Sequence, residues 1–232
     1  MALVKFGGGV TQMSGSIGGT TFARNRSGNY ARSRTKPVNP NTSGQQTARN
    51  AMADLTTRWS STLTTAQRTA WNLYGSSVLM TNRLGENINL TGFNHYVRSN
   101  SIALQQGETL VDDGPTIFEL PQADGTLAVA GSEASQELTI TYDDTVPWAN
   151  EDDGHLFVFQ GTPQNGQRNF FNGPWRFLAT EDGLLATPPT SPLVAPAVFV
   201  ITESQRVWIY ARIWRADGRL SQPFRADIAI GA

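Results

Sequence analysis

The sequence contains no cysteine, and this absence limits the chemistry that the chain can carry. Its 232 residues include only two histidines, His95 and His155. Without thiols the chain cannot form disulfide scaffolds, zinc ribbons, iron–sulfur centres or a thiol nucleophile. Two histidines also exclude most three-histidine metal centres. We therefore expect no cofactor, no catalytic residues, no metal ligands and no enzymatic activity.

Long apolar runs are also missing. No stretch approaches the roughly 18 residues that a membrane-spanning helix requires. The opening MALVKFGGGV has neither the apolar stretch nor the small-residue cleavage site of a secretion signal. We therefore expect no membrane partner. The length suits one large domain or two small ones.

Negative charge is absent from the first quarter of the chain. Residues 1–53 contain seven basic side chains and no acid, and Asp54 is the first carboxylate. The remaining residues hold all 19 acids and 11 arginines, so the two parts carry charges of +7 and −8. Such asymmetry is typical of a basic segment with an acidic partner, either nucleic acid or another protein surface.

The composition of residues 1–41 predicts an extended, glycine-rich basic arm. Six of the 16 residues from Gly7 to Phe22 are glycine, which loses the most entropy on ordering. A few anchor side chains are spaced through this segment: Val10, Ile17, Phe22 and Tyr30. We expect the arm to become ordered against a neighbouring subunit, because it cannot build a core of its own.

Residues 42–110 have the pattern of a small helical region. Thr42 with Gln45 and Thr64 with Gln67 are capping-box signatures, and they predict two helix starts. Gly75 is expected to end the second helix, and a third helix is expected over residues 91–106 with Gly107 as its stop. Apolar residues at steps of three and four predict the buried faces, which include Ala48, Met52, Leu55 and Trp59 in the first helix and Phe93, Tyr96, Val97 and Leu104 in the third.

Residues 115–232 have a β pattern instead. Residues 137–142 alternate with period two, and Asp217-Gly218 is a strong hairpin-turn signal. Further strands are expected at residues 155–160, 175–179, 196–202, 206–215 and 223–230. Together the three segments predict an α+β chain with an extended N-terminal arm, a small helical region and a C-terminal antiparallel β-sandwich.

Motifs for catalysis are not found. The glycine-rich opening lacks the lysine of a phosphate-binding loop, no nucleophile elbow is present, and neither histidine belongs to a metalloprotease motif. We expect His95 to lie on the polar face of its helix. Acidic residues cluster at 112–113, 143–144 and 151–153. A carboxylate pair or a calcium site is conceivable there, but acids at these positions favour solvated turns.

The N-terminal cations are the candidate partner-binding residues, together with one tyrosine: Arg24, Arg26, Tyr30, Arg32, Arg34 and Lys36. Their guanidinium groups suit phosphates, and the tyrosine ring could stack on a base. The same arginines could make bidentate pairs with carboxylates of another protein. The basic density is modest and the rest of the chain is acidic, so a protein partner is favoured over nucleic acid.

The run RSRTKPVNPNT at residues 32–42 resembles small virion structural proteins of tailed bacteriophages and prophages. Similar marks follow in Trp59, in LTTAQRTAW at residues 63–71 and in the Thr91-Gly92 pair before Tyr96. The resemblance is strongest over residues 14–106. It implies a many-copy particle component without enzymatic activity, located in the virion and assembled in the host cytoplasm.

Several functions are compatible with this resemblance. The leading hypothesis is a capsid decoration (cement) protein that binds the major capsid protein through its arm and helices. It is expected to be a homo-oligomer, with a trimer as the natural guess. The alternatives are a neck or tail component such as an adaptor or tube-associated protein, a genome-binding protein, and a host-surface or glycan-binding module that uses Trp148 or Trp175.

Overall fold

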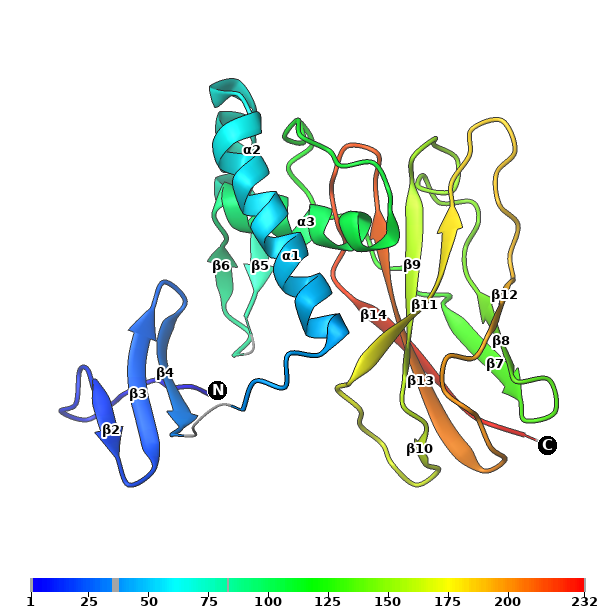
Figure 1. Cartoon of the computed structure of the whole chain (residues 1–232), viewed down its shortest axis with the longest axis horizontal. Coiled ribbons are helices and arrows are strands. Elements are labelled where there is room, and N and C mark those ends of the chain that lie inside the picture. The colour runs from blue at the N-terminus through cyan, green and yellow to red at the C-terminus, as the bar shows by residue number, and fades with distance from the viewer. Residues whose placement is uncertain (1, 35–37, 83, 232) are drawn as a thin grey trace.

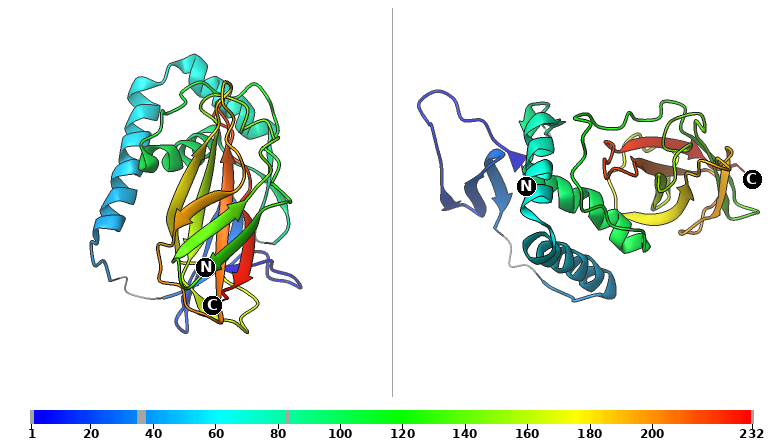
Figure 2. Two further views of the ribbon diagram at one scale, coloured as in Figure 1. Left: turned by 90° about the vertical axis from the view of Figure 1, so that its right-hand side faces the viewer. Right: turned by 90° about the horizontal axis from the view of Figure 1, so that it is seen from above.

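The computed structural model describes residues 2–34, 38–82 and 84–231. Helices and mostly antiparallel sheets occur together, which confirms the expected α+β class. Figure 1 shows the N-terminal sheet on one side, the helices in the middle and the C-terminal strands on the other side. Seen from above in Figure 2, these three parts follow one another along the longest axis. In the described part of the chain, no helix has the length and apolar character needed to cross a bilayer.

The N-terminal segment forms a small antiparallel sheet, so the prediction of an extended arm over residues 1–41 was wrong. The strand order is β1-β4-β3-β2, with bounds Ala2–Leu3 for β1, Gly15–Ile17 for β2, Thr20–Asn25 for β3 and Gly28–Ser33 for β4. Gly18 and Gly19 lie between β2 and β3 with φ of 54° and 82°. Positive φ at both central residues is what a tight hairpin turn requires, so these glycines make turns rather than a loose spacer.

The helical region has the predicted starts. Helix α1 (Ser43–Thr57) begins at Thr42 and helix α2 (Thr65–Ser77) at Thr64, both with complete capping boxes. A π-helical turn, η1 (Arg58–Thr62), extends α1. Helix α3 (Gly92–Gln106) ends at Gly107 in the left-handed conformation, as expected. A two-stranded hairpin between α2 and α3, β5 (Leu79–Thr81) with β6 (Asn87–Asn89), was not predicted.

Gly75 does not end α2, which continues to Ser77. A Cβ at Gly75 would lie 2.7 Å from the carbonyl oxygen of Leu90. Gly92, at the start of α3, lies equally close to α2, since its Cβ would be 2.5 Å from the carbonyl carbon of Trp71. These glycines therefore allow the α2 and α3 backbones to approach each other.

The helices share a core built around aromatic side chains. Its buried members are Leu55, Leu63, Trp71, Tyr74, Val78 and Tyr96. The predicted stripe of α1 is only half right, because Ala48 and Met52 are exposed while Leu55 is buried. The first turns of α1 project away from α2 and α3 (Figure 1), so the apolar side chains there remain exposed.

The C-terminal strands form two antiparallel sheets. The five-stranded sheet has the order β10-β13-β9-β11, with β14 also paired to β13, and the three-stranded sheet has the order β12-β8-β7. One apolar core draws residues from both sheets, including Ile140 and Ile209. The bounds are Ala128–Ser132 for β7, Glu137–Thr141 for β8, His155–Gly161 for β9, Gln164–Asn165 for β10, Trp175–Asp182 for β11, Leu193–Pro196 for β12, Gln205–Trp214 for β13 and Phe224–Ala229 for β14.

Five of the six predicted C-terminal strands are present, and the strand expected at residues 196–202 is wrong. In this range only Pro196 belongs to a strand, β12, and the Ala197 N–H donates to the carbonyl of Gln136 at 2.8 Å. The amide N–H of Val198 donates to Oε1 of buried Gln160 at 2.6 Å, and Nε2 of Gln160 donates to the carbonyl of Phe199 at 3.3 Å. Because a buried glutamine satisfies these groups, the apolar run needs no neighbouring strand.

Candidate functional site

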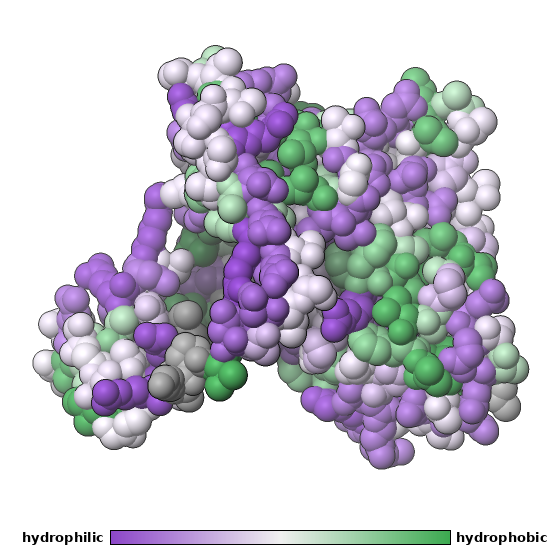
Figure 3. Space-filling model, viewed as in Figure 1, coloured by the Kyte–Doolittle hydropathy of each residue, from purple (hydrophilic) through white to green (hydrophobic). Residues whose placement is uncertain are grey.

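The N-terminal sheet, residues 2–34, has no buried residue. In the space-filling view of Figure 3 it forms a lobe set apart from the rest of the molecule. Neighbouring strands pair through their backbone hydrogen bonds, and β1 and β2 form the two edges of the sheet. A sheet without a packed face is only marginally stable in water, since it gains little from apolar burial. The lobe is therefore poised to gain stability from a partner.

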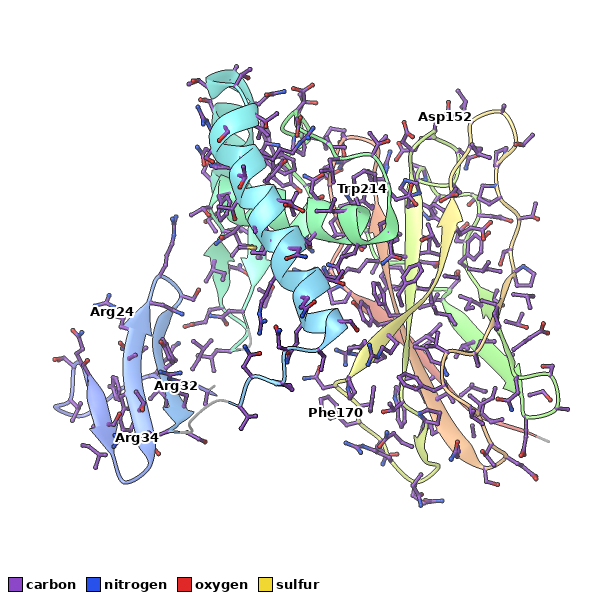
Figure 4. The ribbon with its side chains drawn as sticks, in the orientation of Figure 1. Arg24, Arg32, Arg34, Asp152, Phe170 and Trp214 are labelled. Carbon is purple, nitrogen blue, oxygen red and sulfur yellow. The ribbon has the colours of Figure 1, made fainter. Side chains whose placement is uncertain are left out.

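The strand register divides the predicted residues between two faces. Tyr30 lies opposite Ala23 and Arg32 lies opposite Thr21, so Tyr30 and Arg32 share one face. Arg24 lies opposite Asn29 on the other face, and the separation of Arg24 from Arg32 and Arg34 can be followed in Figure 4. Both faces consequently present positive charge.

The remaining predicted cations lie at the margins of the sheet. Arg26 lies in the turn between β3 and β4, and Arg34 directly follows β4, where its backbone N–H donates to the carbonyl of Gly19 at 2.6 Å. Lys36 lies outside the described residues. The structure thus brings Tyr30 and Arg32 together and distributes the other cations around the sheet.

None of the four arginines makes an ion pair within residues 2–34, 38–82 and 84–231. Lys5 does pair with Glu86 beside the β5–β6 hairpin, but the Lys5 side chain is 73% exposed. An exposed ion pair of this kind contributes at most about 1 kcal/mol. The lobe is thus weakly tied to the body, and its arginines are available to carboxylates or phosphates of a partner.

The basic residue of α1 has a different role. Nη1 of Arg49 donates to the side-chain oxygen of Asn41 at 2.9 Å, and Nη2 donates to that of Asn39 at 2.6 Å. These bonds hold the segment before α1 against the helix. Sequence reasoning counted Arg49 only as part of the N-terminal charge, because its asparagine partners become neighbours only when the chain turns into the helix.

Two of the three acidic clusters are structural, which corrects the prediction of solvated turns. Asp112 accepts two hydrogen bonds from Arg58, each of 2.7 Å, and one from the Tyr96 hydroxyl at 3.2 Å. The Asp112 hydrogen bond raises the pKa of Arg58 above its ordinary value. Glu151 likewise binds Arg215 in a bidentate pair. These carboxylates have cationic partners and join segments that are distant in the sequence.

The expectation that His95 lies on the polar face of its helix was wrong. Its side chain is buried, with 2% of its surface exposed. Its ring meets the Tyr74 ring edge to face at 5.0 Å. Burial lowers the pKa of His95 to about 4 and raises the pKa of Tyr74 to about 12. Both groups are therefore neutral at pH 7 and serve the helical core.

Arg98 links α3 to the β-rich part. Its guanidinium donates to the carbonyls of Leu220 and Ser221 at 2.7 and 2.5 Å. Burial, together with the nearby charge of Arg212, lowers the pKa of Arg98 to about 10, so the group is still charged at pH 7. This cation satisfies backbone carbonyls and is not part of an open site.

The proposed sugar-stacking residues differ sharply in exposure. Trp148 is 1% exposed and belongs to the core between the two sheets, so it cannot stack on a sugar, contrary to the hypothesis. Trp175 is partly exposed on β11, with Tyr210 at 4.9 Å, Phe171 at 5.0 Å and the Arg225 guanidinium 5.4 Å above its ring. Of these two tryptophans, Trp175 is the one whose ring is accessible to a glycan.

A cavity of about 490 Å³ lies between residues 117–126 and the segment that leads into β9. Arg215 and Arg219 line it, but Glu151 and Asp217 already pair with these arginines. The cavity therefore offers no free positive charge to a ligand.

Three residues could hold a metal ion: Glu108, His155 and Asp182. Sequence reasoning found no spacing partner for His155, because the two carboxylates lie 47 residues before it and 27 residues after it. Only the pairing of β9 with β11 and the packing of the α3 C-terminus bring them together.

The fold and this surface define an α+β protein with a protruding basic sheet. No family model matches the chain, and no curated protein matches it. A solved structure, a family 76 glycoside hydrolase from a bovine Bacteroides thetaiotaomicron strain, is similar with 11% identity and a TM-score of 0.33. The match covers 47% of this chain and 20% of the hydrolase.

This match corrects the expectation that the chain has no enzymatic activity. The prediction of no enzymatic activity is therefore withdrawn. At this TM-score the likeness carries no argument for a reaction or a substrate.

Proposed function

We propose that the chain is a structural component of a tailed-phage particle that decorates the capsid shell. The observation that carries the proposal is the N-terminal sheet, which projects from the body, buries none of its residues and carries arginines without ion-pair partners in the described chain. The resemblance at residues 32–42 indicates the kind of particle. In this proposal the C-terminal sheets form a β-sandwich that faces outward, and the chain assembles as a homotrimer.

The physical reason for attachment is the missing core of the lobe. Contact with a shell subunit would cover one face of the sheet and supply carboxylates for Arg32 and Arg34, which form strong bidentate pairs. The edge strands β1 and β2 also present backbone groups without partners in the sheet, which a neighbouring strand could bind. Attachment would therefore combine charge complementarity with burial of a sheet face.

A glycan-binding function is the second candidate, and Trp175 is the observation that favours it. Its ring lies among Tyr210, Phe171 and Arg225, as aromatic rings that receive a sugar face often do. Glycan-array binding that is lost in Trp175→Ala would support it. The proposal of shell attachment makes no use of this residue.

The test is a binding assay with purified shells that lack the protein. The full chain should saturate the shells, and a truncated chain lacking residues 1–34 should not bind. The truncated chain should keep its melting temperature within a few degrees, since Lys5–Glu86 is an exposed tie. If the truncated chain still saturates the shells, the proposed attachment is wrong.

Charge reversal tests the same surface without removing the sheet. The double substitution Arg32→Glu with Arg34→Glu should weaken shell binding, and the binding of the unmodified chain should fall as salt is raised. Arg176→Glu is the matched control, since Arg176 is an exposed arginine on β11. Equal loss in both variants would contradict a specific role for the lobe, and retention on DNA until high salt would favour genome binding instead.

A further inference from the structure

His155, Asp182 and Glu108 meet where α3 ends beside the five-stranded sheet. His155 begins β9 and lies directly opposite Asp182, the last residue of β11. Glu108 follows Gly107, whose left-handed conformation ends α3 and turns the chain toward the sheet. Trp214, labelled in Figure 4 near the end of α3, packs beside His155. Three separate elements thus converge on one imidazole.

The ring of His155 is held in a single orientation. It stacks on Phe157 and Trp214 with centroid separations of 5.6 and 5.3 Å, and its side chain is 7% exposed. Nδ1 lies 2.8 Å from the Asp182 carboxylate. A carboxylate accepts hydrogen bonds, so Nδ1 carries a proton and donates a hydrogen bond to Asp182. In the neutral ring, Nε2 then presents a lone pair.

That lone pair faces a second carboxylate. Nε2 lies 3.7 Å from Oε2 of Glu108, which is too far for a hydrogen bond. A positive charge between the Nε2 lone pair and the Glu108 carboxylate would stabilise both groups. In the described chain, no other basic side chain forms an ion pair with Glu108 or Asp182. A bound cation would supply the missing charge.

The spacing suits a shared zinc ion. Zinc binds imidazole nitrogen at about 2.0–2.1 Å and carboxylate oxygen at about 2.0–2.2 Å, which places two tetrahedral ligands roughly 3.4 Å apart. We propose that Nε2 of His155 and the Glu108 carboxylate bind Zn²⁺, with Asp182 orienting the ring from Nδ1. A carboxylate that fixes the other ring nitrogen is the usual support of a metal-binding histidine. Water completes the coordination.

Zinc titration of the metal-stripped full chain, with a chromophoric chelator as competitor, tests the site. The unmodified chain should bind one Zn²⁺, and Glu108→Gln and His155→Gln should each weaken binding at least tenfold. Asp182→Asn should weaken it by about 10–100-fold, the usual effect of removing an orienting carboxylate. Asp153→Asn is the matched control, because Asp153 is exposed two residues before His155 and its φ of 61° is one that asparagine tolerates.

Nitrogen-15 NMR gives an independent readout, since the chain has only two histidines. One equivalent of Zn²⁺ should shift the Nε2 resonance of His155 and leave His95 unchanged. Three results would overturn the proposal. These are the absence of zinc binding by the unmodified chain, full binding by both Glu108→Gln and His155→Gln, and a His155 ring that is doubly protonated at pH 7.5 and does not respond to zinc.

Discussion

Replacement of Asp112 by alanine should destabilise the helical region by about 3 kcal/mol. The Asp112 side chain is 23% exposed and accepts three hydrogen bonds, two from Arg58 and one from Tyr96. Arg58 is 37% exposed, so water would partly replace its lost partner, at a cost of about 1–2 kcal/mol. Tyr96 is fully buried, and an unpaired hydroxyl there costs about 1–3 kcal/mol.

Burial raises the pKa of Tyr96 above its ordinary value, so at pH 7 its hydroxyl is protonated and donates a hydrogen bond to Asp112. The loss should lower the melting temperature by roughly 6–12 °C in a chain of this length. Urea unfolding followed by tryptophan fluorescence is the assay, because Trp59 and Trp71 both lie against Tyr96.

Asp113→Ala is the matched control. Asp113 is exposed and accepts one side-chain hydrogen bond, from Gln67 at 2.9 Å, so its replacement should cost less than about 1 kcal/mol. A double-mutant cycle that combines Asp112→Ala with Arg58→Ala should give a coupling of at least about 1 kcal/mol. If Asp112→Ala destabilises no more than Asp113→Ala, the reasoning about this carboxylate is refuted.

Two further predictions concern the packing of α2 against α3. Gly92→Ala should destabilise the protein by about 2 kcal/mol or more, because the added methyl meets α2 backbone, whereas Gly44→Ala, with open space around it, should be neutral or slightly stabilising in the same urea assay. The pKa of His95 is about 4 in the folded protein, against 6.5 for a histidine in an unfolded chain, so unfolding takes up a proton between these values. Stability should therefore fall by about 3 kcal/mol as pH drops from 6.5 to 4, and the difference between the unmodified chain and His95→Gln across that range isolates the effect. Parallel urea midpoints for the two proteins would contradict it.

Local sequence signals predicted the three α-helices and five of the fourteen strands in the described chain. Thr42, Thr64 and Thr91 begin the three helices because each side chain accepts from a backbone N–H that the helix leaves free. Gly107 and Gly218 mark the expected stop and turn, with φ of 85° and 83°. These signals depend on neighbouring residues alone, so they can be recognised without the rest of the fold.

Predictions failed where distant segments meet. Gly75 looks like a helix stop, but it is needed for the approach of Leu90, and the apolar run after Pro196 is satisfied by Gln160 rather than by a strand. His95 and Trp148 are buried by elements that the local pattern does not reveal. Burial of a side chain is decided by what packs on it, and spacing along one helix cannot supply that information.

The charge of the lobe follows from the sequence, since no acid precedes Asp54, and so do the helix caps and the turn at Asp217-Gly218. Two features depend on the folded chain as a whole: the glycine-rich segment pairs into a sheet with arginines on both faces, and Glu108, His155 and Asp182 lie close together. The difference lies in how far apart in the sequence the interacting residues are. Caps and turns form from hydrogen bonds within a few residues, whereas a site assembled from three elements exists only after strand pairing and helix packing bring its members together.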